Sequence, residues 1–430
     1  MSSTKIEMPT RPVAPPARPH GGWARSLVMR RLASLARGSL TVLEHGTRTH
    51  FEGTEPGPLA TLEVRDARLW RRVVWGGVLG AGEAYADGDW DSPELVDVVR
   101  LFLANRDALD AIDGGLARPI GAARRVLAML PGHGRQQARR DIQAHYDLGN
   151  DLFAAFLDPT MTYSSAVYGP DLDPEDPASL EAAQVAKLER ICRKLELRPG
   201  MRVLEIGCGW GSFALHAAHH HGVEVVGTTI SPAQRSWAEQ RVAEAGLGRR
   251  IQVLGSDWRD LDGRFERVVS VEMIEAIGAR LMPRFFEALS ERLAPEGLCL
   301  LQAITIQDRL YEAARRRVDF IKRHVFPGSF IPSMAALTRA SAPTGLRWLH
   351  VEDIGPSYAA TLAAWRGRFE AAWPRLAARG ASDRFRRLWR YYLAYCEGGF
   401  REGVLGDIQG VLAGDRAAVP SWIERPEPLP

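Results

Sequence analysis

One stretch of the chain, VLEIGCGWGSFALHAA (residues 203–218), limits the possible folds more than any other. An apolar run of strand length leads directly into three glycines with the spacing G-x-G-x-G, and a helical segment follows. Glycine lets the backbone turn sharply and approach a ligand closely, and the N-terminus of the next helix attracts negative charge. The stretch therefore predicts an α/β fold with a nucleotide-like ligand at the glycine loop.

The segments around this loop repeat the same alternation. The strand-like runs VEVVGTTI, IQVLGS, RVVSVEM and LCLLQAITI follow in order and are separated by segments with helical periodicity. This order predicts a doubly wound, mostly parallel sheet, in which ligands bind at the carboxyl ends of the strands. A dinucleotide enzyme would carry an acid near the end of the second strand. The chain has Thr228 and Thr229 there, which argues against NAD.

The 430 residues are enough for more than one domain. We expect a disordered tail over residues 1–20, a small N-terminal α+β domain over 21–113 that associates with lipid or membrane or mediates dimerisation, a basic linker over 114–140 and the α/β domain over 141–430. The linker contains six arginines and no acid. Its mixture of arginine and apolar residues favours an anionic membrane surface, and solvated helix faces explain it equally well. We expect no nucleic acid partner, because no nucleic-acid-binding motif accompanies the charge.

No apolar run approaches the length of a membrane span, and the N-terminus lacks the apolar core of a secretory signal. We therefore expect a cytoplasmic protein, attached peripherally to the inner face of the membrane. The four cysteines lie far apart and predict neither a disulfide framework nor a metal site. The histidines of HAAHHH, around His219, are expected to form a solvated helix end.

Two carboxylates stand out in SVEMIEAIG (residues 270–278), just past the end of a predicted strand. Glu272 and Glu275 lie three residues apart among apolar neighbours. Carboxylates seldom occupy such surroundings unless they are paired or functional.

Taken together, EIGCGWG resembles the cofactor loop of S-adenosylmethionine (SAM)-dependent methyltransferases, and its tryptophan is similar to that of the cyclopropane-fatty-acyl-phospholipid synthase family. HYDLGNDLFAAFLDPTMTYSSAVY (residues 145–168), TISPAQ, DWRDL and YYLAYCEGGFREG also resemble motifs of that family. The resemblance runs from about Asp141 to Leu412. It implies a seven-stranded, Rossmann-like sheet and methyl transfer to double bonds in the acyl chains of membrane phospholipids.

The resemblance also implies a cofactor site. Its residues are Tyr163 and Ser164 at the methionine end, Gly207, Gly209 and Gly211 beneath the cofactor, Thr229 and Gln234 at the adenosine, and Trp258 near the adenine. A core aromatic is the alternative for Trp258, and a simple turn hydroxyl is the alternative for Ser164.

Cyclopropane-forming members of this family are thought to hold a bicarbonate ion as base, using a cysteine, a glutamate, a histidine and a tyrosine. Glu275 and Tyr358 match two of these residues, but Ser165 replaces the cysteine and Gln302 replaces the histidine. We hypothesise that Glu272 takes or borders the bicarbonate position and serves as a built-in base, with Glu275 positioning it or sharing its proton. Alternatively, Glu272 pairs with an arginine. Cys396 matches a family cysteine and is expected to line the site.

These departures leave two products open: a cyclopropane, or a methyl-branched or methylene fatty acid. Some relatives act with a reductase partner, and a homodimer is a further expectation. Two other functions stay open as well. One is a small-molecule N-methyltransferase of the same fold, and the other is a SAM- or lipid-binding protein that has lost catalysis.

Overall fold

The computed structural model describes residues 22–106, 149–176 and 178–424. The expected tail (1–20) and basic linker (114–140) lie outside these residues, as does the start of the motif that begins at His145. Among the described helices, none is long and apolar enough to cross a membrane.

The N-terminal domain, described over residues 22–106, is a four-stranded sheet with three helices. Its strands follow the order β2-β1-β3-β4, with β1 antiparallel to β2 and parallel to β3. Buried side chains such as Leu40, Val42 and Leu62 form its core. Its elements are α1 (Gly22–Leu32), β1 (Arg37–Glu44), β2 (Thr47–Glu52), β3 (Glu55–Val64), α2 (Arg68–Ala86), β4 (Trp90–Asp91) and α3 (Leu95–Ala104).

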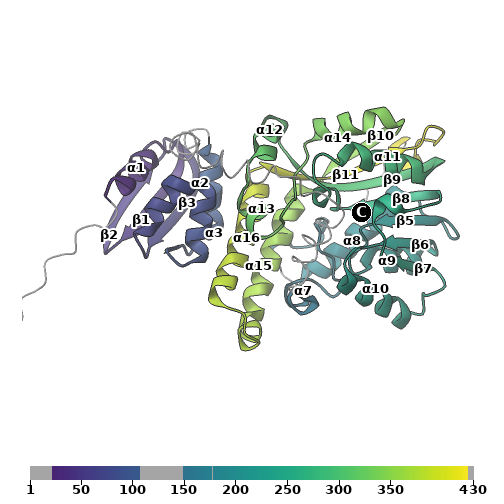
Figure 1. Cartoon of the computed structure of the whole chain (residues 1–430), viewed down its shortest axis with the longest axis horizontal. Coiled ribbons are helices and arrows are strands. Elements are labelled where there is room, and N and C mark those ends of the chain that lie inside the picture. The colour runs from purple at the N-terminus through teal and green to yellow at the C-terminus, as the bar shows by residue number, and fades with distance from the viewer. Residues whose placement is uncertain (1–21, 107–148, 177, 425–430) are drawn as a thin grey trace, which may run out of the picture.

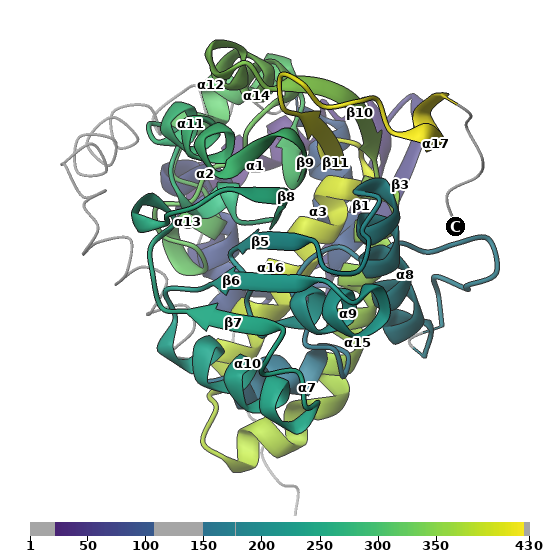
Figure 2. The same cartoon turned by 90° about the vertical axis from the view of Figure 1, so that its right-hand side faces the viewer.

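A seven-stranded sheet of order β10-β11-β9-β8-β5-β6-β7 forms the centre of the second domain. Figure 2 shows β8, β5, β6 and β7 side by side in this order. Every strand is parallel to the others except β11, which pairs antiparallel with both β9 and β10. The strands are β5 (Arg202–Ile206), β6 (Glu224–Thr228), β7 (Ile251–Leu254), β8 (Phe265–Val271), β9 (Leu293–Ile306), β10 (Arg347–Asp353) and β11 (Leu405–Ala413).

Apolar side chains cover both faces of this sheet. Along β9, Cys299 and Leu301 pack into one core cluster with α11 and α14, whereas Leu298 and Leu300 pack into another with α8 and α9. Successive side chains of a strand point to opposite faces, so a strand buried on both sides is a continuous apolar run. The predicted doubly wound α/β fold with a smaller N-terminal α+β domain is therefore confirmed.

The remaining helices surround the large sheet and carry most of the site. They are α7 (Asn150–Phe156), α8 (Ser179–Lys194), α9 (Ser212–His221), α10 (Pro232–Glu244), α11 (Met282–Arg292), α12 (Asp308–Arg316), α13 (Phe320–His324), α14 (Met334–Ser341), α15 (Gly355–Ala378), α16 (Asp383–Arg401) and α17 (Ser421–Glu424). Short 3₁₀ turns lie at Trp258–Asp260, Ile274–Ala276 and Ala342–Thr344.

The N-terminal domain packs against α16. Figure 1 shows α15 and α16 standing between this domain and the large sheet. Arg387 of α16 donates hydrogen bonds to the carbonyl oxygens of Tyr85 and Trp90, and its guanidinium lies 4.2 Å from the centre of the Tyr85 ring. A Cβ atom at Gly82 would lie 2.7 Å from the Tyr391 ring. The two domains are thus in close contact.

Candidate active site

A cavity of about 1300 Å³ opens at the carboxyl ends of the parallel strands. Its wall includes Ile206 at the end of β5, Thr228 at the end of β6 and Val271 at the end of β8. This is the position at which doubly wound sheets bind their ligands. Every residue that the sequence predicted for the site, apart from Ser165, Gly211 and Gln302, borders this cavity.

The glycine loop follows β5 and forms the floor of the cavity. Gly207 has a φ of 83°, and a Cβ atom there would lie 2.6 Å from the Met273 side chain. Gly211 has a φ of 84° and caps the N-terminus of α9. Both positions favour glycine because residues with a side chain rarely adopt this left-handed backbone conformation. The loop thus places backbone groups that no side chain covers, and the N-terminus of α9, at the position predicted for the cofactor.

Polar groups at the predicted adenosine side follow β6: Thr229 lies just past the strand, and Gln234 lies in the first turn of α10. The hydroxyl of Thr229 donates to Oε1 of Gln234 over 2.8 Å, and both side chains are buried at the cavity wall. Trp258 also borders the cavity, while its ring meets Phe285 edge-on at 5.3 Å between centroids. Trp258 is therefore a core aromatic with one edge at the site.

Ser164 and Tyr163 are the residues predicted to contact the methionine end of the cofactor. Both have hydrogen-bond partners that the sequence did not predict. Nζ of Lys187 donates to Oγ of Ser164 over 2.8 Å, and the hydroxyls of Tyr163 and Tyr392 lie 2.7 Å apart. Lys187 is buried, and burial lowers its pKa to about 8. Glu205, just before the glycine loop, is also buried. Burial raises its pKa to about 8, although the positive charge of Lys187 acts to lower that pKa.

The sequence did contain a signal for Lys187. Within α8, Leu180, Ala183, Leu188 and Ile191 form the buried face, and the helical spacing places Lys187 on the same face. A lysine at such a position is rarely buried without a partner or a function.

The carboxylate of Glu272 accepts three hydrogen bonds. The backbone N–H of Ser165 and Nε2 of Gln302 both donate to Oε1 over 2.8 Å, and the hydroxyl of Tyr358 donates to Oε2 over 2.7 Å. Burial raises the pKa of Glu272, whereas the bonds from Tyr358 and Ser165 lower it. Among the described residues, no arginine pairs with Glu272, so the alternative of an arginine ion pair does not describe this geometry.

Backbone strain accompanies this arrangement. Glu272 has a φ of 47°, an uncommon conformation for a residue with a side chain that costs on the order of 1–3 kcal/mol. Its backbone N–H donates to the carbonyl oxygen of Gln302, which fixes the turn after β8 against β9. The fold thus holds the Glu272 side chain in a defined direction at an energetic cost.

Glu275, three residues after Glu272, differs from it in hydrogen bonding and in protonation. Its Oε1 accepts from the backbone N–H of Ile304 over 2.6 Å, and its buried Oε2 has no hydrogen-bond partner among the described residues. Burial, reinforced by the negative charge of Glu272, raises the pKa of Glu275 to about 8. At neutral pH Glu275 is therefore largely protonated.

Asp407 on β11 is a third acid of the site, which the sequence analysis missed. Nε2 of Gln302 donates both to Asp407 Oδ2 over 2.9 Å and to Glu272 Oε1, so the amide links the two carboxyl groups. Burial and the nearby Glu272 raise the pKa of Asp407 well above its ordinary value. Its signal was an acid inside the run LGDIQGVLA, in which Gln409 is the one other polar side chain.

Aromatic side chains form the wall opposite the glycine loop. The Tyr358 ring stacks on Phe400 at 4.5 Å, and Tyr391, Tyr392 and Tyr395 of α16 face the cavity. Cys396 borders the cavity as predicted, and burial raises the pKa of its thiol, so it stays protonated. A protonated thiol is a poor nucleophile, and Cys396 is a lining residue.

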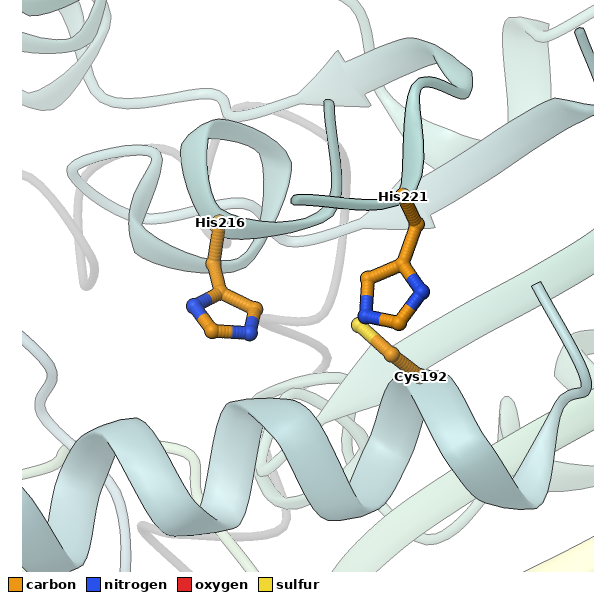
Figure 3. A group of neighbouring side chains, drawn as sticks. All are labelled: Cys192, His216 and His221. Carbon is orange, nitrogen blue, oxygen red and sulfur yellow. The ribbon is translucent and has the colours of Figure 1, made fainter. Parts of the chain in front are cut away.

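A cluster of Cys192, His216 and His221 lies between α8 and α9, outside the cavity wall (Figure 3). Nε2 of His216 and of His221 lie 3.2 and 2.9 Å from Oε2 of Glu189. Burial opposes ionisation of Glu189, but hydrogen bonds from His221, Arg193 and His216 lower its pKa to about 2. His219 and His220 are exposed, as expected for a solvated helix end, whereas the His216 side chain is only 9% exposed. An ion-pair cluster accounts for their positions.

The glycine loop at the carboxyl ends of a doubly wound sheet, together with the lined cavity, defines a SAM-dependent methyltransferase. Residues 133–409 match the model of the family described as mycolic acid cyclopropane synthetase. The chain belongs to this family.

Two curated relatives cover most of the chain. The tuberculostearic acid methyltransferase UfaA1 of Mycobacterium tuberculosis is 42% identical over 81% of this chain and 82% of its own length. The cyclopropane-fatty-acyl-phospholipid synthase of Escherichia coli K12 is 38% identical over 80% of this chain and 85% of its own.

Solved structures agree with this assignment. The cyclopropane synthase MmaA2 from Mycobacterium tuberculosis is 33% identical, with a TM-score of 0.59 over 64% of this chain and 98% of its own. The mycolic acid cyclopropane synthase CmaA1, complexed with SAH and CTAB, is 31% identical, with a TM-score of 0.58 over 64% of this chain and 97% of its own. The predicted family and cofactor are confirmed.

Proposed function

We propose that this enzyme methylates a double bond in an unsaturated acyl chain of a membrane phospholipid and releases a methylated alkene. One observation carries the proposal: the Glu272 carboxylate accepts hydrogen bonds from Ser165, Gln302 and Tyr358. These are three of the four positions that match the bicarbonate-holding residues of cyclopropane-forming relatives. The chain thus supplies its own carboxylate where those relatives are thought to bind an ion.

The cavity fits SAM in its size and in its donors. The glycine loop offers bare backbone, Ser164 and Lys187 offer polar groups for the methionine end, and Gln234 offers an amide for the adenosine. When bound, SAM supplies an electrophilic methyl group next to a positively charged sulfur. The protein must hold an alkene in line with that group and keep water away, because an alkene is a weak nucleophile.

The three acids of the site have different surroundings, and Glu272 has the most hydrogen-bond donors. Burial raises the pKa of Glu275 to about 8 and raises the pKa of Asp407 well above its ordinary value, while three donors stabilise the carboxylate of Glu272. Environments that separate the pKa values of neighbouring acids assign them different roles. In our proposal Glu272 accepts the proton, and the neutral Glu275 limits the negative charge around it.

A bicarbonate ion does not fit beside this carboxylate. The donors that would hold the ion are already bonded to Glu272, and the next groups are Glu275 and Asp407. A second anion in such a site would meet the negative charge of Glu272 at close range and would find these donors already in use. We therefore derive no step that uses bicarbonate.

Proton removal decides the product. The methyl group bonds to one alkene carbon as its bond to sulfur breaks, and the neighbouring carbon becomes positively charged. Hydrogen migration with its electron pair moves this charge to the methyl-bearing carbon, next to the aromatic faces of the wall. Glu272 then takes a proton from the new methyl group, and that C–H electron pair forms a double bond between the former methyl carbon and the chain carbon that bears it. The similarity to a tuberculostearic acid methyltransferase also supports an open-chain product.

An alkene product would suit a separate reductase that saturates it, and such a reductase is the partner we propose. We further propose peripheral association with the inner face of the cytoplasmic membrane, where phospholipid acyl chains are found. Formation of a homodimer stays a prediction.

The test is release of S-adenosylhomocysteine (SAH) when the protein is incubated with SAM and phospholipid vesicles. Vesicles with monounsaturated chains should support release together with a one-carbon gain in the fatty acids, and fully saturated vesicles should support neither. Methyl transfer to small amines but not to vesicles would instead favour an N-methyltransferase. SAM binding without transfer to any acceptor would favour a non-catalytic protein.

A further inference from the structure

The cavity does not end at the methyl-transfer site. It continues past Tyr395 and Gly399 of α16 and past Val99 and Phe102 of α3, which is where the two domains meet. From there it extends into the N-terminal domain. The side chains bordering it there include Val28, Leu32, Val42, Leu62, Leu69 and Val73. These come from α1, the sheet and α2, so this arm of the cavity lies within the core of the domain.

The side chains that line this arm are mostly apolar. Among the described N-terminal residues that line it, Arg106 alone carries a charge, and it lies just beyond α3. Trp70 also borders the arm, but its indole N–H is already bonded to Glu44 over 2.7 Å. A polar ligand would lose its hydrogen bonds to water without replacement in such surroundings, which is unfavourable. The occupant must therefore be apolar.

The size of the cavity also calls for an occupant beyond SAM. Pockets for one drug-sized ligand measure about 300–1000 Å³, and this cavity has about 1300 Å³. Protein interiors are close-packed, and an unfilled apolar void lowers stability. Buried valines and leucines that border a hollow instead of filling it are expected where a chain-like ligand enters.

The N-terminal arm reaches the surface at a break in α2. Gly77 departs from helical geometry with φ 56° and ψ −139°, and its neighbours Trp75 and Val78 border the cavity while being 41% and 49% exposed. Trp23, 50% exposed, meets the Trp75 ring edge-on at 6.1 Å. Exposed tryptophans are typical of surfaces that enter the lipid headgroup region.

Basic side chains accompany these tryptophans. Arg71 precedes Trp75 by one helical turn, and Arg30 lies on α1, the helix of Trp23; both arginines are exposed. Within the part of the chain that the structure describes, neither forms an ion pair. Aromatic rings beside uncompensated positive charge complement an anionic bilayer surface.

We propose that the N-terminal domain is an acyl-chain-binding site, which a phospholipid chain enters beside Gly77 and which continues into the methyl-transfer site. The proposal rests on the proposed function, because it assigns the chain to the same lipid substrate. It gives the N-terminal domain a direct part in holding the substrate rather than only a place beside the catalytic domain.

Photocrosslinking tests this assignment without requiring turnover. The full-length protein with SAH is mixed with anionic vesicles containing a phospholipid whose acyl chain carries a diazirine, irradiated, digested and analysed by mass spectrometry. We expect adducts on α1, α2 and α3 at residues that border the cavity, in addition to adducts in the catalytic domain. Adducts confined to the catalytic domain, in a protein that still methylates vesicle lipid, would overturn this inference and leave the proposed function standing. Adducts in the N-terminal domain without methylation of vesicle lipid would leave the inference standing and overturn the proposed function.

A matched pair of variants adds a second readout. Val73→Trp places bulk into the arm at a half-buried position, whereas Leu59→Trp adds the same side chain at a residue of the same domain that is 68% exposed and outside this cavity. Val73→Trp should reduce N-terminal adducts and lipid methylation at least several-fold with unchanged SAH affinity, and Leu59→Trp should change neither. Equal adduct yields in both folded variants would contradict the proposal.

Discussion

Tyr358 and Glu272, 86 residues apart in the chain, are joined by a 2.7 Å hydrogen bond from the phenol to Oε2 of the carboxylate. Tyr358 lies on α15 and Glu272 follows β8, so the bond ties a helix to the carboxyl edge of the sheet. A buried phenol that donates to a buried carboxylate stabilises the ionised form of the acid. The bond therefore sets the protonation state on which our account of the reaction depends.

Tyr358→Phe should shift the pH dependence of the enzyme. The hydrogen bond from Tyr358 lowers the pKa of Glu272, so its loss raises that pKa, and a higher pH is then needed to ionise the base. The acidic limb of the kcat–pH profile should move upward, with a drop of about 10-fold or more in kcat at neutral pH. A profile identical to that of the wild type would show that the bond does not tune the base.

Glu272→Gln should remove the proton acceptor while keeping its shape. We expect turnover to fall about 100-fold or more, which is the usual contribution of a positioned base, with SAH affinity unchanged. Glu287→Gln, at an exposed position on α11, is the matched control and should retain full activity. Turnover near the wild-type level in Glu272→Gln would remove the base assignment.

Glu275→Gln should stabilise the protein in a pH-dependent way. The folded protein keeps Glu275 protonated up to about pH 8, whereas the unfolded chain ionises it near its ordinary value of 4.5. The folded state thus binds more protons between these values, and the free energy of unfolding falls as pH rises through them. The Tm of the variant should exceed that of the wild type by a margin that grows from pH 5 to pH 8. A constant margin would contradict the raised pKa.

Lys187→Met should weaken cofactor binding. Lys187 donates to Ser164, and its positive charge acts on the buried carboxyl groups of Glu272 and Glu205, so its loss should raise the Kd for SAH by about 10-fold or more. Isothermal titration calorimetry measures this. The control is Lys322→Met, at a lysine on α13 that borders the cavity and, among the described residues, bonds to the carbonyl oxygens of Ala314 and Arg317. Equal SAH affinity in the two variants would contradict the role of Lys187.

Removal of bicarbonate should leave the reaction unchanged. Assays in buffer freed of carbon dioxide, with and without added bicarbonate, should give the same initial rates. The reason is that the hydrogen-bond donors of Ser165, Gln302 and Tyr358 are already bonded to Glu272. The E. coli cyclopropane-fatty-acyl-phospholipid synthase can be assayed in parallel for comparison. A rate that falls on depletion and returns on addition would show that an external ion serves as the base.

The sequence predicted the parts of the site that depend on local order. The glycine loop, the strand before it and the helix after it lie within about 20 residues, and the turn residues there can adopt few conformations. The positions of Glu272 and Glu275 past a strand end were equally local. Five strands of the large sheet were located from apolar runs. The runs of β10 and β11 were missed because polar residues and glycines interrupt them, as Asp407 and Gly410 do in β11.

Contacts between residues far apart in the chain could not be predicted from local sequence patterns. Asp407 meets Gln302 only because β11 pairs antiparallel with β9 in the register that places Gln409 opposite Gln302. No local pattern fixes the register between strands about 100 residues apart. The continuity of the cavity into the N-terminal domain likewise depends on how α3 packs against α16, which only the assembled structure reveals.

The most direct test of the account is the structure of the product. The protein is incubated with monounsaturated phospholipid vesicles and SAM whose methyl group is fully deuterated, and the fatty acids are analysed by mass spectrometry before and after mild hydrogenation. We predict a one-carbon gain that retains two of the three deuteriums and takes up hydrogen, as expected for a methylene branch (C=CD2) formed by loss of a deuteron from the transferred methyl group. A product that retains two deuteriums but takes up no hydrogen would be a cyclopropane and would contradict the account.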